Sequence, residues 1–474
     1  MKRKVLEGLL LMTVGSIAVW GQYEECRADE MTYSIVAEGF DWGTSVTKVV
    51  VNVGSELEDK IVSDVKKVHV NVNKTYLGSD TIAKEMDYST GEYVDAWSAK
   101  GEREVKGVYG SDEDGVPSEE NEGYLTFEMN VGPEEGYGDV LGTEIETGLN
   151  HSTVLDCHYT VTFEDADGNE YVCDQENENS TYGLADLFTH NQVYTTENQE
   201  ILEDPYEDND SLLYASYEPE DKEKHPLIIW LHGFSEGGSD THIAVMGNKV
   251  TALVDEEIQG LMGGAYVLVP QAPTQWMNTN GVPAGLSVEM DADSMRSIYT
   301  DTLIELIQKY VEEHPGIDQN RIYIGGCSNG GYMTMNLLFE KPDYFAAAYP
   351  VCEACEAAYI SDEQLESIQD VPIWFTHCAE DTLVQPDIYT IPTYERLKKA
   401  GADNLHFTYW NDVHDTSGEF LDETGTPEKY FGHFSWMYVL NNQCTVDNDY
   451  EDGNICDAAG TGETLFQWLA EQSN

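Results

Sequence analysis

The chain has 474 residues, of which 41% are hydrophobic, so it is long enough for two domains and apolar enough to bury their cores. Its 24 Lys and Arg face 89 Asp and Glu, which gives a formal net charge of −65. A surface this acidic repels nucleic acid, phosphorylated substrates and anionic lipid, so we expect none of these as partners.

The first residues have the pattern of a secretory signal peptide. The basic start MKRK precedes a mostly apolar run that ends near Gly21 and is short for a membrane span. No later stretch is long and apolar enough to cross a bilayer. We therefore expect residues 1–21 to be removed and the mature protein to be secreted, with no membrane partner.

Residues 30–200 have the sequence pattern of an all-β region. Short runs alternate apolar and polar positions, and turn clusters such as SDEDG and DADGN separate them. This pattern is typical of an antiparallel sandwich, and nothing in it has catalytic spacing. The runs lie at 33–40, 45–54, 63–73, 123–132 and 153–163.

The nine cysteines of a secreted chain predict some disulfides. Cys157 and Cys173 flank a hairpin signal, and Cys444 and Cys456 close a short polar loop, so these are the preferred pairs. A Cys355–Cys378 bridge is a further hypothesis. No zinc-type cysteine pattern is present, and the acidic segment 447–457 lacks the sixth-position glycine of an EF-hand loop, which leaves calcium as a weak alternative.

The hydrophobic pattern changes after residues 197–211, an acidic stretch that we interpret as the connection between the two domains. Continuous apolar runs at 227–233 and 265–271 indicate strands buried on both faces of a parallel sheet. Strands and helices then alternate, which predicts a doubly wound α/β domain over residues 207–474. The predicted helices lie at 294–316, 329–340, 393–401 and 463–472, and further strands at 371–377 and 404–410.

The stretch IYIGGCSNGGYMT contains Ser328 inside a G-x-S-x-G pattern, between a predicted strand and a predicted helix. A serine on such a tight turn needs small neighbours, because the backbone there packs closely. The pattern predicts a nucleophile. A rival nucleophile at Cys327 is disfavoured, because the turn exposes the serine position and directs its neighbour into the core.

A nucleophilic serine needs an acid and then a base in this chain order. Asp381 follows the buried strand 371–377, with Glu380 the neighbouring alternative. Two histidines follow the acid, His414 and His433, and spacing does not choose between them. His232 and His377 are interpreted as structural.

The loop LHGFSEGG follows the first buried strand of the α/β domain and predicts an oxyanion hole. The backbone amides of Phe234 and Asn329 are the expected donors, and two such donors stabilise a developing alkoxide by several kcal/mol. No metal or organic cofactor is required by this chemistry.

The stretches LIIWLHGFSEGG, AYVLVPQAP, RIYIGGCSNGGYMT and GHFSW resemble serine esterases of the α/β-hydrolase fold. They are similar to the polyhydroxybutyrate-depolymerase and feruloyl-esterase-like group, often labelled prolyl-oligopeptidase-like. IVAEGFDWGTSVTKVVVNVG resembles the immunoglobulin-like module that precedes some of these enzymes. The resemblance implies a base within G-H-x-S-W, which favours His433, while the insertion 415–431 keeps His414 open.

A secreted esterase with a sandwich module suggests a polymeric substrate. Trp276 and Trp436 near the expected rim are candidates for stacking on sugar or aryl rings, with burial in the core as the alternative. The preferred function is hydrolysis of feruloyl or acetyl esters on plant polysaccharide. The alternatives are a peptidase, which usually carries a propeller absent here, a polyester hydrolase, and a non-enzymatic binding protein.

Overall fold

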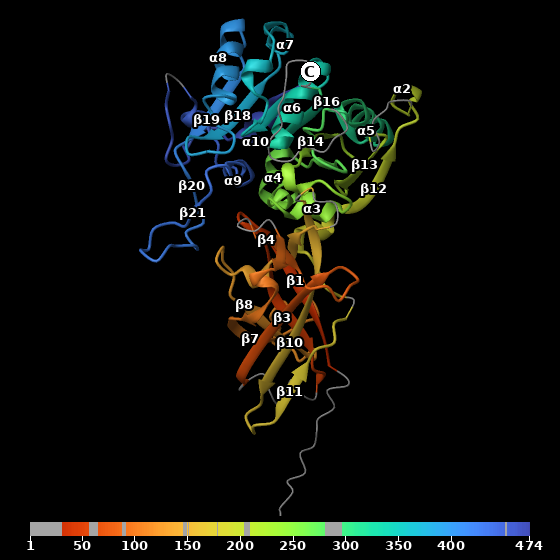
Figure 1. Cartoon of the computed structure of the whole chain (residues 1–474), viewed down its shortest axis with the longest axis vertical. Helices are drawn as coiled ribbons and strands as arrows, with labels where there is room; N and C mark the ends of the chain where they lie inside the picture. The colour runs from red at the N-terminus through yellow and green to blue at the C-terminus, as the bar shows by residue number, and fades with distance from the viewer. Residues whose placement is uncertain are drawn as a thin grey trace, which may run out of the picture.

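The structure is a computed structural model, and it describes residues 31–55, 65–87, 92–145, 149, 151–177, 179–202, 209–279, 296–450 and 453–474. A β-rich part and a mixed α/β part are stacked along the longest axis (Figure 1). The predicted signal peptide at 1–21 lies outside the described residues. Within the described ranges, every helix is too short or too polar to cross a membrane.

The N-terminal part is an antiparallel sandwich, as predicted. One sheet has the order β1 (Thr32–Phe40), β2 (Gly43–Asn52), β8 (Tyr124–Met129), β7 (Val105–Ser111). The facing sheet has the order β11 (Glu170–Cys173), β10 (Ser152–Glu164), β3 (Lys66–Tyr76), β6 (Lys100–Arg103), with β9 (Leu141–Thr143) paired to β10. A separate hairpin joins β4 (Lys84–Asp87) and β5 (Glu92–Asp95). Alternate apolar residues fill the space between the sheets, among them Val49, Phe127, Val161 and Phe163.

The second part is built on one eight-stranded sheet. Its strand order is β12 (Thr189–Thr195), β13 (Ser211–Tyr217), β15 (Tyr266–Gln271), β14 (His225–Leu231), β16 (Ile317–Cys327), β17 (Ala347–Val351), β18 (Ile373–Cys378), β19 (Leu405–Trp410). The pairings from β15 to β19 are parallel, and those of β12 and β13 are antiparallel. The carboxyl ends of the parallel strands therefore meet at one edge, where the candidate residues lie.

Both faces of this sheet are covered, which explains the continuous apolar run of β14. Ile228 and Trp230 belong to one buried cluster, and Leu227, Ile229 and Leu231 belong to another. The first cluster includes α4 (Glu256–Met262), α9 (Trp436–Leu440) and α10 (Leu465–Glu471), and the second includes α5 (Thr300–Glu313), α6 (Asn329–Glu340), α7 (Asp362–Ser367) and α8 (Thr390–Ala400). The short helices α2 (Gln199–Leu202) and α3 (Thr241–Met246) complete the set among the described residues.

The domain boundary differs from the prediction of a sandwich over 30–200 and a catalytic domain from 207. Strand β12 pairs with β13 and belongs to the α/β sheet, which therefore begins at Thr189. The acidic stretch 197–211 is not an interdomain connection. It joins two neighbouring strands of the same sheet.

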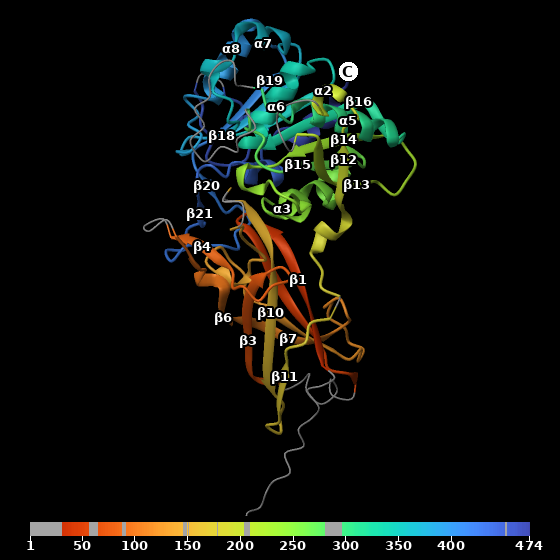
Figure 2. The same ribbon diagram turned by 45° about the vertical axis from the view of Figure 1, so that its right-hand side comes forward.

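The β1–β2 turn of the sandwich docks onto the α/β part. The Asp41 carboxylate accepts from Lys249 Nζ at 3.1 Å and from Asn441 Nδ2 at 2.8 Å. The Trp42 and Phe420 rings meet edge to face with centroids 4.3 Å apart. Phe420 lies in the predicted insertion 415–431, whose base is the small ladder of β20 (Val413–His414) and β21 (Lys429–Tyr430). Figures 1 and 2 both show this segment reaching toward the sandwich.

The predicted disulfides do not form. All eight cysteines of the described residues are unpaired. Cys173 lies opposite Val161 in the β10–β11 register, whereas Cys157 lies opposite Lys74 on β3, so the two thiols are not cross-strand neighbours. Cys444 Sγ lies 3.5 Å from Thr376 Oγ1, Cys456 donates to the Tyr409 carbonyl, and Cys378 donates to the Asn411 carbonyl. Cys355 is likewise unpaired.

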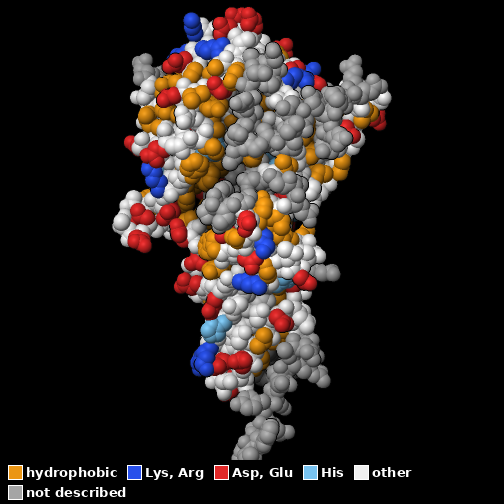
Figure 3. Space-filling model, in the orientation of Figure 1, with side chains coloured by type: hydrophobic (Ala, Val, Ile, Leu, Met, Phe, Trp, Pro, Cys, Tyr) orange, Lys and Arg blue, Asp and Glu red, His pale blue; other side chains and the backbone are white. Residues whose placement is uncertain are grey.

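Acidic side chains are spread over both parts of the surface in Figure 3 and do not form one patch. In the segment 447–457, Asp447 accepts from the amide and hydroxyl of Thr461, and Asp449 accepts from the Phe407 amide. These carboxylates thus have a structural use in fixing loops.

Candidate active site

Ser328 stands on a strained turn between β16 and α6. Its backbone has φ 55° and ψ −111°, a conformation that residues other than glycine rarely adopt. The neighbouring glycines provide the room for this turn. A Cβ at Gly326 would lie 2.4 Å from the Leu231 carbonyl oxygen, and one at Gly330 would lie 1.9 Å from the same atom. The predicted clearance is therefore real, and the turn packs directly against the end of β14.

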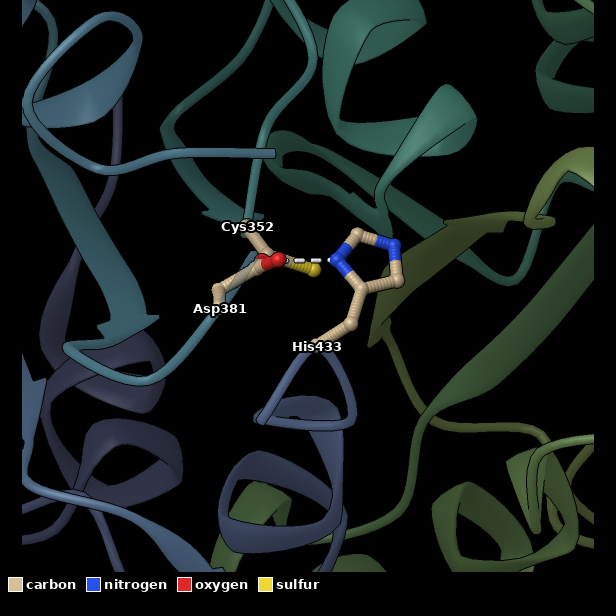
Figure 4. Close-up of side chains that lie close together, drawn as sticks. All are labelled: Cys352, Asp381 and His433. Carbon is tan, nitrogen blue, oxygen red and sulfur yellow. Dashed lines mark hydrogen bonds and ion pairs between the residues drawn. The ribbon is translucent and has the colours of Figure 1, made fainter. Parts of the chain in front are cut away.

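Asp381 and His433 form a buried hydrogen-bonded pair. The His433 Nδ1 lies 2.6 Å from Asp381 Oδ2, and both residues are almost fully buried (Figure 4). Because a carboxylate only accepts, Nδ1 carries the proton, and Nε2 keeps a lone pair in the neutral ring. In Figure 4 the second ring nitrogen points away from Asp381.

Gly432 allows the His433 loop to reach the acid loop. A Cβ at this position would lie 2.5 Å from the Glu380 carbonyl oxygen and 2.9 Å from the Asp381 amide nitrogen. Real Cβ atoms do not approach backbone so closely, so the pairing of His433 with Asp381 depends on glycine here.

His414 has other partners. Its Nδ1 lies 2.8 Å from Asp412 Oδ1 and 3.2 Å from the Tyr438 hydroxyl. The neighbouring alternative acid, Glu380, forms an ion pair with Lys429 at 2.9 Å. Among the predicted acids and bases, Asp381 and His433 are thus the two that the fold brings together.

The Ser328 turn lies beside the same pair through β17. The Ser328 amide donates to the Val351 carbonyl at 2.9 Å, and the Ala354 amide donates to the Ser328 carbonyl at 3.2 Å. Between these residues stands Cys352, whose Sγ, an Asp381 carboxylate oxygen and a His433 ring nitrogen all lie within 4.8 Å of one another. The serine turn, the acid and the histidine therefore converge around one thiol.

Asp381 has more donors than the triad pattern alone predicts. Oδ1 accepts from the amides of Leu383 and Val384, both at 2.9 Å. Oδ2 accepts from a second histidine, His377, at 3.1 Å. Burial alone would raise the pKa of Asp381, but the hydrogen bonds from His377 and His433 outweigh it and hold that pKa below its usual range. The carboxylate is ionised and fixed in orientation.

His377, which the sequence predicted to be structural only, also bonds the acid of the site. Its Nε2 faces two acceptors, Asp381 Oδ2 and the Val384 carbonyl at 2.8 Å, so this nitrogen is the donor. Its Nδ1 lies 2.8 Å from Thr390 Oγ1, whose hydroxyl is 3.4 Å from the buried Glu353. The signal was present in THCAED, where a histidine at the end of a buried strand precedes the acid by four residues.

The predicted oxyanion loop is locked by His232. Its Nδ1 donates to the Gly233 carbonyl at 2.7 Å, and its Nε2 accepts from the Ala272 amide at 3.1 Å. Burial lowers the pKa of His232 to about 3, so the ring is neutral, as this bonding requires. The Gly233 amide donates to Glu236 Oε2 at 2.6 Å, which fixes both polar groups of that peptide segment.

The two predicted oxyanion donors remain available. Within the described part of the chain, neither the Phe234 amide nor the Asn329 amide donates to another backbone or side-chain group. Asn329 is the first residue of α6, where an amide has no intrahelical acceptor. Its side chain instead accepts from the Trp276 amide at 2.7 Å, which ties the loop after β15 to the serine turn.

Neither predicted substrate-stacking tryptophan presents an exposed ring. Trp276 is fully buried against His232, with ring centroids 4.9 Å apart. Trp436 is 5% exposed and meets the His433 ring edge to face at 5.5 Å. The structure places both in the core beneath the site, the alternative that the sequence left open.

Cys352, Asp381 and His433 also carry atoms of the kinds that bind zinc. However, the His433 Nδ1 and the Asp381 carboxylate already bond each other, and burial raises the pKa of the Cys352 thiol well above its usual range. This arrangement fits an acid–base pair with a protonated thiol packed beside it.

Comparisons with known proteins agree with the two-part architecture. Residues 32–171 match the family described as the esterase Ig-like N-terminal domain, and residues 214–426 match the phospholipase/carboxylesterase family. Among solved structures, the chain is similar to one described as a thermostable esterase, with 22% identity, a TM-score of 0.64, and coverage of 94% of this chain and 100% of that one.

A structure described as a ferulic acid esterase is 15% identical, has a TM-score of 0.36, and covers 48% of this chain and 92% of its own. No curated protein matches the chain. The likeness to the thermostable esterase concerns the fold, and the two family matches carry the assignment. The chain is a hydrolase in which a region that matches the esterase Ig-like N-terminal domain precedes an α/β-hydrolase domain that matches the phospholipase/carboxylesterase family.

Proposed function

We propose that the protein is a secreted serine esterase that removes feruloyl or acetyl groups from plant polysaccharide through an acyl-enzyme. The observation that carries the proposal is the strained Ser328 turn beside the buried Asp381–His433 pair. Such a turn is maintained against its conformational cost where it presents a reactive group.

The chemistry follows from the hydrogen-bonding capacity of each group. His433 Nε2 takes the proton of the Ser328 hydroxyl as the oxygen attacks the ester carbonyl. Asp381 keeps the His433 proton on Nδ1 and stabilises the imidazolium that forms. The amides of Phe234 and Asn329 hold the oxyanion, and the alcohol leaves with the proton from His433. Water then repeats the sequence on the acyl-enzyme and releases the acid.

The polymeric substrate is supported by two features of the chain. The segment 1–21 has the pattern of a secretory signal, which supports an extracellular site of action, outside the cell where polymeric substrates are accessible. The net charge of −65 disfavours anionic substrates and is compatible with neutral acylated sugars.

The test compares wild type with Ser328→Ala on a short-chain aryl acetate, methyl ferulate, acetylated xylan and a polyester. We expect wild type to hydrolyse the aryl acetate and at least one polysaccharide-type ester, and the variant to lose all of these activities with an unchanged circular dichroism spectrum. Near-native turnover by a folded Ser328→Ala variant would overturn the nucleophile. Hydrolysis of the polyester with no activity on methyl ferulate or acetylated xylan would overturn the substrate class.

A further inference from the structure

A pocket lies between the sandwich and the α/β domain, beside the oxyanion loop. It has a volume of about 550 Å³. Tyr76 and Leu77 at the end of β3 and the segment 151–153 at the start of β10 form its sandwich side, whereas Gly238 to Asp240 and Pro273 form its α/β side. Neither domain makes this pocket alone.

The α/β wall of the pocket belongs to the loops that build the candidate active site. Gly238 follows the η5 turn (Phe234–Glu236) after one residue, and its amide donates to the Ala272 carbonyl at 2.9 Å. The Ala272 amide in turn donates to His232, the residue that locks the oxyanion loop. Gly237 lies so close to the Thr274 carbonyl that a Cβ would approach it to 1.7 Å. The loop that forms the α/β wall of the pocket is therefore joined to the oxyanion loop by hydrogen bonds and close backbone packing.

His151 is an unpartnered polar group in the lining. Its side chain is almost fully buried, with a relative exposure of 4%, and its Nε2 has neither a hydrogen-bond partner among the described residues nor appreciable accessible surface. Burial lowers the pKa of His151, which keeps the ring neutral, with one nitrogen a donor and the other an acceptor. A buried group of this kind costs free energy unless something bonds it, and a hydroxyl, which both donates and accepts, suits it.

The rest of the lining has the composition of a site for a neutral polyhydroxylated ligand. The carboxylates of Glu144 and Asp240 are able to accept hydrogen bonds from ligand hydroxyls, although Asp240 Oδ1 already accepts from the His242 amide. The hydroxyls of Ser79, Thr153 and Ser239 both donate and accept. The Tyr76 ring and Leu77 offer an apolar wall. None of the described lining residues is Lys or Arg, so an anionic ligand finds two carboxylates and no cation.

We propose that this interdomain pocket is a subsite for a neutral sugar residue of the ester's alcohol part, and that the buried His151 ring reorients on binding to hydrogen-bond one of its hydroxyls. The inference rests on the proposed function for the link to ester hydrolysis, and it deepens that function by assigning sugar recognition to both domains. The Ig-like domain then contributes directly to substrate binding, because the His151 and Tyr76 side of the pocket is its own surface.

The binding test uses full-length Ser328→Ala, so that no hydrolysis occurs, and titrates it with a neutral, unacylated xylo-oligosaccharide by calorimetry. We expect binding that weakens at least tenfold when His151→Phe is added and when Ser239→Trp is added. Ser239 is exposed, so this second variant fills the pocket without disturbing the core. The matched control is His69→Phe, because His69 is an exposed histidine of the same sandwich outside the pocket. Equal binding by all three variants, or none by Ser328→Ala itself, would overturn the subsite.

The kinetic test uses the active enzyme and takes the ratio of kcat/KM on an acetylated xylo-oligosaccharide to kcat/KM on an aryl acetate. We expect His151→Phe and Ser239→Trp to lower this ratio at least tenfold, mainly through KM, and His69→Phe to leave it unchanged. A constant ratio with active enzyme refutes the subsite while the esterase function stands. If wild type hydrolyses none of the esters, the proposed function is refuted. The binding titration then still shows whether the pocket binds the sugar.

Discussion

Replacing Glu236 with glutamine removes a buried acid of the oxyanion loop and changes how stability depends on pH. Glu236 is almost fully buried and accepts the Gly233 amide at 2.6 Å. Burial raises its pKa from 4.5 to about 8. The folded state therefore holds a proton that the unfolded state releases between these two values, so stability falls as pH rises through this window.

The magnitude follows from the two pKa values. With 4.5 in the unfolded and about 8 in the folded protein, the Glu236 contribution to the free energy of unfolding drops by about 4 kcal/mol between pH 5 and pH 9. Glutamine keeps an acceptor for the Gly233 amide and does not titrate. We therefore expect the variant to gain stability relative to wild type by about this amount as pH rises.

The assay is urea unfolding of wild type and Glu236→Gln at several pH values from 5 to 9, compared as a difference so that other titrating groups cancel. Glu366→Gln is the control, because Glu366 is exposed on α7. Parallel stability curves for wild type and Glu236→Gln across this range would show that Glu236 does not bind a proton on folding. A pH-dependent difference between wild type and the control would show that the effect does not depend on burial.

Three further predictions concern the acid and the base. His433→Ala should lower kcat by roughly 10⁴-fold and His414→Ala should leave it near wild type, because His433 bonds Asp381 whereas His414 bonds Asp412; a larger loss in His414→Ala would reverse the choice of base. His377→Ala should lower kcat/KM by roughly 10- to 100-fold, because it removes a donor to the ionised Asp381, and His377→Gln should recover part of the loss. Equal activity of both variants and wild type would show that His377 contributes only to packing. Gly432→Ala should lower kcat roughly 100-fold, because a Cβ there meets the Glu380 backbone at 2.5 Å. Its control is Gly260→Ala, which has open space and should be fully active; similar kinetics for the two would contradict the required close approach.

Much of the fold was readable because local patterns and long-range packing agree. The helix predicted at 329–340 has the same limits as α6, since a buried strand and a glycine-rich turn fix its start. The order of Ser328, Asp381 and the following histidine could also be predicted, because the carboxyl ends of parallel strands lie at one edge of the sheet.

Features that depend on which strands pair could not be predicted from the sequence. The alternating residues of β12 look like one more sandwich strand, and only its pairing with β13 places it in the α/β sheet. The Cys157–Cys173 prediction failed because register, which the hairpin signal does not specify, sets Cys173 opposite Val161. The choice of His433 over His414 depended on how the insertion returns, and the β20–β21 ladder closes that insertion at its base.

Labelling the full-length protein with a fluorophosphonate, followed by mass mapping of the modified peptide, tests whether Ser328 is the nucleophile of an esterase. We expect one adduct per chain on Ser328, its loss in Ser328→Ala and strong suppression in His433→Ala. An adduct on another residue, or undiminished labelling of Ser328→Ala, would show that Ser328 is not the nucleophile.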